Sequence, residues 1–319
     1  MLYLAYLNII HRRTFMYTYA WYQWLGFFYI YCFFGWIFES TYVSLKQRRF
    51  VNRGFLRIPM LPLYGTGAVM MLWVSLPVKD NLFAVYLSGV IAATILEYIT
   101  GWTMEKLFKM KYWDYSNQKF QLNGYICLSS SIAWGFLTLF LTEIIHTPIA
   151  DLLLSIPPLV LILIDLAISI VFCTDTILSV RAALDLAKLL ETLSALRSDL
   201  EEIQVQIALL KAETSQRVDT MKDETITRVE RLRSDLHNEV STRIMGWKEE
   251  TEDAKLRLSE LHQEQISALL EKKRAITEHR RALTSHIGSI KKGILKGNPS
   301  ASSRFSEALK ELQDEYLKK

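Results

Sequence analysis

The sequence predicts an all-α membrane protein: a bundle of five spanning helices, with a possible parallel two-helix repeat, followed by a long cytoplasmic coiled coil. Apolar runs near the length of about 20 residues that crosses a bilayer follow one another from Trp21 to Cys173. After Ala182 the chain is charged and nearly free of glycine, and its leucines are spaced by threes and fours. The phrase Gly-Trp-x-x-Glu occurs twice, as "GWIFE" and "GWTME".

Five apolar runs predict five spans. They cover approximately residues 21–43, 61–78, 82–104, 125–145 and 152–173. The second is short and follows two prolines, and the fifth has Pro157 and Pro158 near its start, where a helix tolerates proline. We therefore expect a transmembrane domain at residues 21–182, preceded by an N-terminal segment at residues 1–20.

The loops predict the orientation. Basic residues gather between spans one and two and between spans three and four, whereas Lys79 is the only one in the two opposite loops. By the positive-inside rule the N-terminus is outside and the C-terminal half is cytoplasmic, in a multi-pass protein of the plasma membrane. The "HRR" at residues 11–13 would then lie outside. A start at Met16 would remove this conflict, so residues 1–15 are either part of the protein or a wrongly assigned start.

The doubled phrase predicts a parallel duplication of two helices. Each copy ends one span and is followed by a basic loop, an asparagine shortly before a glycine, and a helix rich in small residues. The alternative is coincidence, because glycine, tryptophan and glutamate are all common where helices end at a membrane surface.

The glutamates of the phrase are candidate functional residues. Glu39 and Glu105 lie four residues after Gly35 and Gly101, so each pair shares a helical face, and Glu97 extends the second face. A carboxylate in hydrocarbon costs at least about 2–3 kcal/mol and needs a partner or water. We expect Glu39 and Glu105 to face each other's unit across a pseudo-twofold interface.

Arg53 and Arg57 are the nearest candidate counter-charges in the sequence. Two interpretations remain open: a buried ion-pair network that locks the units together, and a polar vestibule for an ion or solute. Asp165, in the middle of span five, has no cation near it in the sequence and is the best single candidate for a protonatable pathway residue.

A series of phrases carries a family resemblance. In order they are "GWIFES", "NRGFL", "PMLPLYGTG", "EYITG", "WDYS" and "NGYICLSSSIAWG". Over residues 21–148 the chain resembles the bacterial membrane family labelled ABC-transporter type IV, or CmpB-like. The motif residues are Gly35, Trp36, Asn52, Gly54, Tyr64, Gly65, Gly101, Trp102, Trp113, Asp114, Asn123 and Gly124. The resemblance implies transport by analogy with the label alone.

The same resemblance implies a separate ATPase subunit, because no G-x-x-x-x-G-K-[ST] phosphate loop occurs in this chain. The membrane part holds no nucleophile elbow, no H-E-x-x-H and no Cys–His arrangement. We therefore expect no enzymatic activity, no metal and no cofactor.

The C-terminal half predicts a coiled-coil stalk at residues 183–275. Its seam is formed by Leu186, Leu189, Leu193, Leu196, Leu200, Ile203, Ile207 and Leu210. This strict 3-4 spacing predicts a homo-oligomer, and a straight helix to Arg274 would be about 135 Å long at 1.5 Å per residue.

Residues 276–319 form a basic segment and a short amphipathic tail. Residues 272–296 hold eight Lys or Arg and one Glu. We interpret this patch as a solvated helix end; anionic lipid or nucleic acid is the less favoured partner. "GNPSASS" at residues 297–303 is expected to be a linker before the tail at residues 305–317.

The leading hypothesis is a permease or channel that moves an unidentified ion or small solute and is oligomerised by its coiled coil. The alternative is a non-transporting membrane anchor or scaffold, whose coiled coil gathers cytoplasmic partners. An active permease predicts solute flux in liposomes, and an anchor predicts none.

Overall fold

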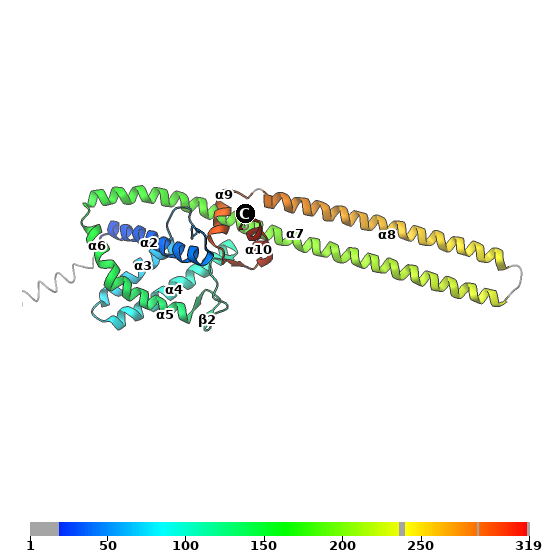
Figure 1. The fold of residues 1–319 in the computed structure, drawn as a ribbon, viewed down its shortest axis with the longest axis horizontal. Coiled ribbons are helices and arrows are strands. Elements are labelled where there is room, and N and C mark those ends of the chain that lie inside the picture. Colours follow the sequence, from blue (N-terminus) through cyan, green and yellow to red (C-terminus); the bar gives the residue numbers. More distant parts are fainter. Residues whose placement is uncertain (1–18, 236–239, 286, 318–319) are drawn as a thin grey trace, which may run out of the picture. The chain divides into compact units, whose positions relative to one another are not determined.

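The computed structural model describes residues 19–235, 240–285 and 287–317 (Figure 1). The question of the start codon and nearly all of the expected N-terminal segment lie outside these residues. The described chain is almost entirely helical, and its strands are two residues long. The all-α prediction is confirmed.

The membrane part begins with three helices joined by loops. Their bounds are α2 Trp21–Gln47, α3 Pro62–Ser75 with the 3₁₀ turn η1 Leu76–Val78, and α4 Leu82–Phe108. Helix α3 starts at a proline, which lacks the N–H that a first turn leaves unpaired. Asn81 caps the N-terminus of helix α4, and its side chain accepts hydrogen bonds from two backbone N–H groups of the first turn. Both α2 and α4 end at a basic residue in the left-handed conformation, Arg48 and Lys109.

Three further segments complete this part and lead out of it: α5 Leu128–Phe140, the π-helical turn η2 Leu141–Ile145 with α6 His146–Leu154, and α7 Pro158–Asp235. The π turn ends three residues before Pro148, whose ring would otherwise meet the carbonyl four residues earlier in a regular α-helix. The helix therefore runs on to Leu154, beyond the expected end of span four. The fifth run starts later than expected, at Pro158, because a helix accepts proline in its first turn.

Within the described residues, three helices are long and apolar enough to cross a membrane: Leu82–Phe108, Leu128–Leu154 and the apolar part of Pro158–Arg231. Pro62–Val78 is apolar but shorter. Helix α2 is as long as α4, but its tyrosines, tryptophans and glutamine lower its hydropathy. These lengths and compositions are those of a membrane protein, whereas five spans remain a prediction.

Close helix packing in the membrane part depends on glycines. Helix α2 packs on α3, α3 on α4 and α4 on α5. A Cβ on Gly35 would overlap Tyr64, and one on Gly89 would overlap Thr138. Such small residues let backbones approach where lipid removes the hydrophobic drive for association. A core cluster that includes Phe27, Leu72 and Leu153 lies between the helices.

Four short elements and two helices lie near the loops. Strand β1 Met110–Lys111 pairs antiparallel with β4 Ser302–Ser303, and β2 Gln121–Leu122 pairs with β3 Ile126–Cys127. The two late helices are α9 Ser289–Gly297 and α10 Ser306–Leu317. The β1–β4 pair joins the C-terminal segment to the loop after α4.

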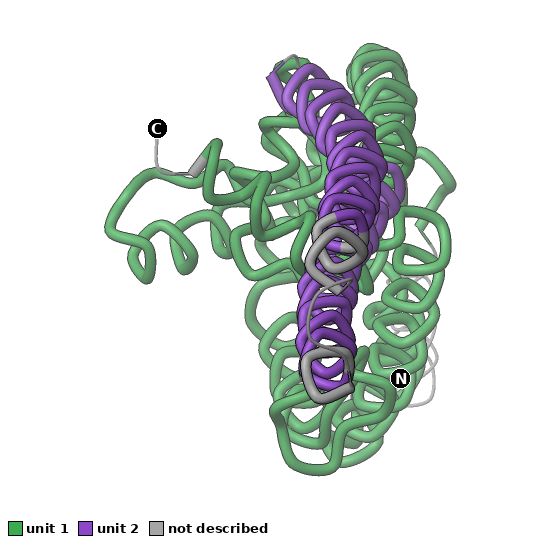
Figure 2. The backbone as a smooth tube through the Cα atoms, turned by 90° about the vertical axis from the view of Figure 1, so that its right-hand side faces the viewer, with its two compact units in different colours: residues 1–190, 287–319 green, residues 191–286 purple. Residues whose placement is uncertain are grey.

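The chain divides into two compact units, residues 1–190 with 287–319 (unit 1) and residues 191–286 (unit 2) (Figure 2). Unit 2 is a helical hairpin: α7 runs to Asp235, and α8 Val240–Ser285 returns beside it (Figures 1 and 2). The expected straight stalk to Arg274 is therefore wrong, because the chain reverses direction after Asp235. Each arm is about 65–70 Å long at 1.5 Å per residue.

Half of the heptad seam is buried within the single chain, whereas Leu189, Leu196, Ile207 and Leu210 are only partly buried. Leu186, Leu193, Leu200 and Ile203 are each at most 9% exposed. The spacing correctly marked a buried helical face, because every third or fourth residue of a helix shares one side. Association with a second chain is not needed to bury these residues, so the predicted homo-oligomer is a separate question.

Candidate functional site

The motif residues gather at one end of unit 1, which we call the basic end. It consists of the loops at residues 48–61 and 109–127 together with the helix ends that they join. Each loop follows one copy of the Gly-Trp-x-x-Glu phrase.

In the first copy, Gly35, Tyr64 and Glu39 form one arrangement. The ring of Tyr64 on α3 lies where a Cβ on Gly35 of α2 would be. Its hydroxyl donates a hydrogen bond of 2.8 Å to Oε2 of Glu39, one turn farther along α2. The glycine thus brings the ring close enough for its hydroxyl to reach the glutamate.

The second copy repeats this arrangement with Gly101, Tyr125 and Glu105. A Cβ on Gly101 would lie 3.2 Å from the Cβ of Tyr125, and the Tyr125 hydroxyl donates to Glu105 over 2.7 Å. Each glutamate thus accepts a hydrogen bond from a tyrosine in its own copy of the two-helix repeat. These bonds do not meet the expectation that Glu39 and Glu105 face each other's repeat, because the glycine on the same helical face leaves room for the tyrosine of the segment that follows in the same repeat.

The two glutamates use different cations. Arg53 lies 3.3 Å from Glu39, measured from Nε to Oε1, as one of the two expected pairings. Glu105 instead lies 3.7 Å from Nζ of Lys111, which is in its own loop. Lys111 was not predicted, because both expected counter-charges, Arg53 and Arg57, lie in the first loop.

Arg57 has a partner that sequence reasoning did not find. Its Nε lies 2.8 Å from Oδ1 of Asp175 on α7, and its backbone N–H donates to Oδ2 over 2.8 Å. The backbone N–H of Ile58 also donates to Oδ2, over 3.3 Å. Asp175 is 3% exposed and ties the first loop to α7. A second aspartate ten residues after Asp165 was the available signal.

The "NRGF" motif shapes the first loop. Asn52 accepts a hydrogen bond of 2.6 Å from the indole N–H of Trp36 and donates one of 3.1 Å to the carbonyl of Arg57. Gly54 has a φ of +140°, a conformation that side chains with a Cβ rarely adopt. Asn52 and Gly54 therefore set the path of the loop that carries Arg53.

Arg53 also clamps the C-terminal segment. It is 8% exposed, and its guanidinium donates to the carbonyls of Tyr112 and Gly297, each over 3.2 Å, and to the side chain of Asn298. Asn298 donates in turn to the carbonyl of Gly54 over 3.3 Å. The expected linker at residues 297–303 is therefore wrong at its start, because Asn298 is 2% exposed and hydrogen-bonded on both sides.

The "WDYS" motif shapes the second loop. The indole of Trp113 donates to the carbonyl of Tyr125 over 2.9 Å. Asp114 accepts from the backbone and hydroxyl of Ser116 and, over 2.7 Å, from the hydroxyl of Ser302. The motif thus closes its own turn and binds the C-terminal segment beside the β1–β4 pair.

Four motif residues have more local roles. Asn123 donates a hydrogen bond of 3.0 Å to the Tyr98 hydroxyl, and Gly124 has a positive φ of 74°. Trp102 is 46% exposed, and Nζ of Lys106 lies 4.7 Å from its ring centroid. Gly65 packs closely on Cys32 and the backbone of Phe28.

The part of the chain that carries most of these motifs matches a known family model. Residues 26–180 match the model of the family described as "Putative ABC-transporter type IV". The predicted resemblance is confirmed, and the match extends past residue 148 into α7. It covers just under half of the 319 residues. Comparison with curated proteins and with solved structures finds no match.

The region that matches the ABC-transporter type IV model also contains a buried carboxylate outside the two glutamate–tyrosine pairs. Glu97 is 5% exposed and accepts hydrogen bonds from the indole of Trp134 over 2.9 Å and the hydroxyl of Tyr115 over 3.1 Å. The Ser130 hydroxyl donates to it over 3.4 Å. None of these three donors is a cation, so Glu97 links α4 to α5 and to the "WDYS" loop through hydrogen bonds alone.

The family match also includes Asp165, which lies apart from the basic-end contacts. Asp165 is 3% exposed, and its Oδ2 has no hydrogen-bond partner in the part of the chain that the structure describes. Its Oδ1 lies 3.7 Å from where a Cβ on Gly26 would be, so it faces α2. The hydroxyls of Thr176 and Ser179, farther along α7, are likewise buried without a partner among the described residues.

His146 is also a buried polar group of the membrane part. It is 3% exposed, and its two ring nitrogens lie 2.9 Å from the hydroxyls of Tyr19 and Tyr31. Among the described residues, no group of three or more His, Cys, Asp or Glu is placed to hold a metal ion.

The Asp114 contact gives a prediction about pH. Burial raises the pKa of Asp114, but hydrogen bonds from Ser116 and Ser302 and the charge of Lys111 outweigh it and lower that pKa below its ordinary value. A lowered folded-state pKa stabilises the fold above the ordinary value of about 3.9, and this contribution is lost as pH falls through the folded pKa.

We therefore expect the difference in thermal midpoint between the native protein and Asp114→Asn to be constant above about pH 5 and to shrink below about pH 4. Thermal unfolding followed by tryptophan fluorescence across this range measures it. A difference that does not change with pH would contradict this role of Asp114.

Proposed function

We propose that unit 1 is a permease-type membrane protein that moves protons along the face of α7 that packs against α2. The observation that carries the proposal is the buried Asp165 with an oxygen that has no partner among the described residues. An unpaired carboxylate inside a membrane is costly unless it takes up a proton or meets water, and such residues mark proton relays. The proposal rests on this residue and assigns no catalytic step.

Other polar groups continue along the same face. Ser169 lies one turn after Asp165, and its hydroxyl is 2.6 Å from the Tyr29 hydroxyl on α2. Thr176 and Ser179 follow at positions that share this face by helical spacing. Their unpaired hydroxyls supply positions where water could bind and carry a proton between Asp165 and the basic end.

The proposal includes the topology predicted from the sequence. In it, α2 and α3 with η1 also cross the plasma membrane, which makes five spans, and the basic end and unit 2 are cytoplasmic. The family match supports a link to ATP-driven transport. We propose that a separate ATPase subunit docks at the basic end.

We also propose that the protein forms homo-oligomers, but that the contact between copies does not use the whole predicted heptad seam. Because Leu193, Leu200 and Ile203 are already buried within the chain, a second copy would have to use another face. The hairpin offers large exposed apolar side chains at Leu209 and Leu261.

A flux experiment tests proton movement. The full-length protein is reconstituted into liposomes, and proton entry under an imposed membrane potential is followed with an enclosed pH-sensitive dye. We expect flux above that of empty liposomes, and Asp165→Asn should reduce it about tenfold or more, since the relay loses the carboxyl group that binds the proton.

Asp151→Asn is the matched control, because Asp151 is an exposed aspartate on α6. It should leave flux unchanged, and both variants should elute and unfold like the native protein. Flux equal to that of empty liposomes, or equal flux from Asp165→Asn and the native protein, would refute the proposal.

The second candidate function is a membrane anchor that gathers cytoplasmic partners through unit 2. The ion pairs of two arginines favour it: Arg53 and Arg57 hold Glu39, Asp175 and the C-terminal segment, which is a structural use of charge. Absence of flux from correctly folded protein would favour this function.

A further inference from the structure

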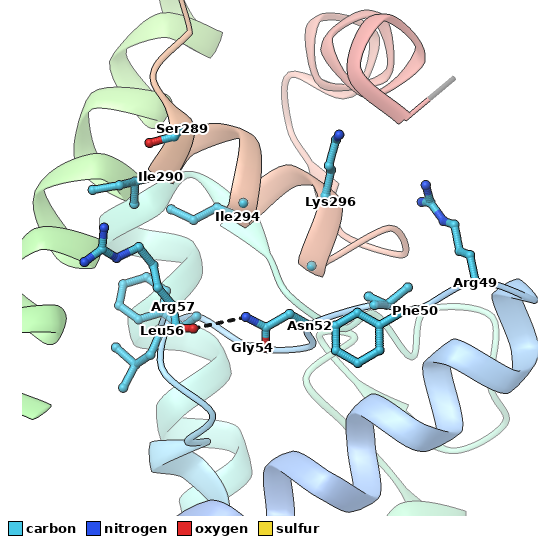
Figure 3. Close-up of a pocket in the computed structure, with 14 residues that line it drawn as sticks. Arg49, Phe50, Asn52, Gly54, Leu56, Arg57, Ser289, Ile290, Ile294 and Lys296 are labelled. Atoms are coloured by element: carbon cyan, nitrogen blue, oxygen red, sulfur yellow. Dashed lines mark hydrogen bonds between the residues drawn. The ribbon is translucent and has the colours of Figure 1, made fainter. Parts of the chain in front are cut away.

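A pocket of about 400 Å³ lies in unit 1 between the loop after α2 and helix α9 (Figure 3). Gly293 leaves room for it, because nothing lies within 4 Å of a Cβ built there. One turn later Gly297 packs closely, with its Cβ position 2.7 Å from the carbonyl oxygen of Asn52. Helix α9 therefore touches the loop at one end and stands away from it at Gly293.

The pocket combines an apolar wall with a basic rim. Ile290 and Ile294 line it from α9, and Phe50 lines it from the loop (Figure 3). Arg49, Arg57 and Lys296 also line it, and no acidic residue is among its lining residues. The side chain of Arg57 remains 54% exposed although its Nε pairs with Asp175. The pocket thus suits a molecule that has both an anionic and an apolar part.

An adjoining groove runs along the last turns of α2. It has a volume of about 500 Å³ and is lined by Trp36, Ile37 and Leu45 among others. Phe50 lines both the groove and the pocket, so the two hollows meet at its ring. Leu45 and Phe50 are 75% and 78% exposed. An apolar surface of this kind beside basic residues is expected where a helix leaves a membrane.

We propose that the pocket and groove together bind one anionic phospholipid. Its phosphate lies beside Arg49 and Lys296, which flank the same side of the pocket, and an acyl chain passes Phe50 and lies along the groove on α2 (Figure 3). Charge complementarity favours an anionic head group, and the groove accounts for the acyl chain, which free phosphate or nucleic acid would lack. The proposal relies on the membrane location of α2 in the proposed function, but it does not require proton movement.

Binding there would connect two distant parts of the sequence. The lipid would touch both the loop after α2 and α9, beside the contact of Arg53 with Asn298. A ligand that binds only the folded state stabilises it by mass action. An anionic lipid should therefore hold the C-terminal segment of unit 1 against the loop after α2.

The test measures lipid binding to the full-length protein in detergent by native mass spectrometry. Phosphatidylglycerol is compared with phosphatidylcholine of the same chains, and inorganic phosphate is a third probe. We expect phosphatidylglycerol to bind at least about tenfold more tightly than phosphatidylcholine, and Lys296→Gln to weaken it about fivefold, as expected for about 1 kcal/mol per basic residue near an anionic surface.

Gly293→Phe should fill the pocket without displacing a neighbour and reduce phosphatidylglycerol binding to the level of phosphatidylcholine. Gly246→Phe is the matched control, because Gly246 on α8 also has nothing within 4 Å of a built Cβ. It should bind like the native protein, and both variants should unfold at the native midpoint without lipid.

Three results would overturn the proposal. These are equal affinity for the two lipids, native binding by Gly293→Phe, and competition by inorganic phosphate at the lipid's own concentration. The last result would show a site for free phosphate. Because none of these measurements depends on flux, the lipid site and the proton pathway can fail separately.

Discussion

Arg53→Met is expected to lower the stability of unit 1 by about 3–5 kcal/mol, as for other buried charge pairs that lose one partner. The arginine side chain is 10% exposed, and its loss leaves the carboxylate of Glu39 without its cation. It also leaves the carbonyls of Tyr112 and Gly297 without these donors. Methionine keeps much of the volume, so the loss comes from charge and hydrogen bonds.

Thermal unfolding of the full-length protein in detergent measures this effect. A loss of this size should lower the midpoint by at least about 6 °C in a unit of about 200 residues. Limited proteolysis should also show faster cleavage near Asn298, because the clamp on the C-terminal segment is lost. Lys106→Met is the matched control: Lys106 is an exposed cation at the end of α4 that contacts the ring of Trp102.

A double variant tests whether the pair itself causes the effect. Glu39→Gln should restore part of the stability lost in Arg53→Met, because it removes the stranded charge. If the losses of Arg53→Met and Glu39→Gln simply add, the ion pair is not the source of stability. An unchanged midpoint for Arg53→Met would contradict the clamp altogether.

Gly35→Ala should be the most damaging alanine substitution among three glycines of the membrane helices. A Cβ there would overlap the Cβ of Tyr64, which cannot rotate away because it is attached to the backbone of α3. Helices α2 and α3 would have to separate, and the bond from Tyr64 to Glu39 would lengthen. Overpacking of this kind costs about 1–3 kcal/mol or more. Gly35→Leu should abolish the folded unit.

The other two glycines make a graded series. At Gly101 the nearest atoms lie 3.1–3.3 Å from the built Cβ, so alanine should cost less than at Gly35. At Gly67 the nearest atom is Leu96 Cδ2 at 3.8 Å, an ordinary contact, so alanine should be neutral or slightly stabilising. Folded yield and thermal midpoint should fall in the order Gly67, Gly101, Gly35. Equal behaviour of all three variants would contradict the packing role of Gly35.

Several site features could be predicted because they depend on spacing along one helix. Glycine and glutamate four residues apart share a face, so the functional face of each phrase and the need of Glu39 for a cation followed from the sequence. Arg53 was one of two candidates for that cation. The choice between Arg53 and Arg57 could not be made, because both lie in one loop and the path of that loop depends on Asn52 and Gly54.

The contacts of the C-terminal segment could not be predicted. Asn298 lies 245 residues after Arg53, and "GNPSASS" has the composition of a flexible linker. Only the folded chain brings its backbone beside the buried guanidinium and its Ser302 beside Asp114. The reversal of the chain after Asp235 was missed for a related reason: a heptad seam records which face is buried and does not record which helix covers it.

The sequence by itself determined the helical class, the membrane character and the resemblance to the ABC-transporter type IV family, since each follows from local composition, periodicity or short motifs. Only the tertiary structure determined which side chains form hydrogen bonds and ion pairs with one another. It assigned Tyr64 and Tyr125 to the repeated glutamates, Asp175 to Arg57, and the C-terminal segment to Arg53. Partner choice depends on the distance between side chains in space, and helix packing at glycines such as Gly35 sets that distance.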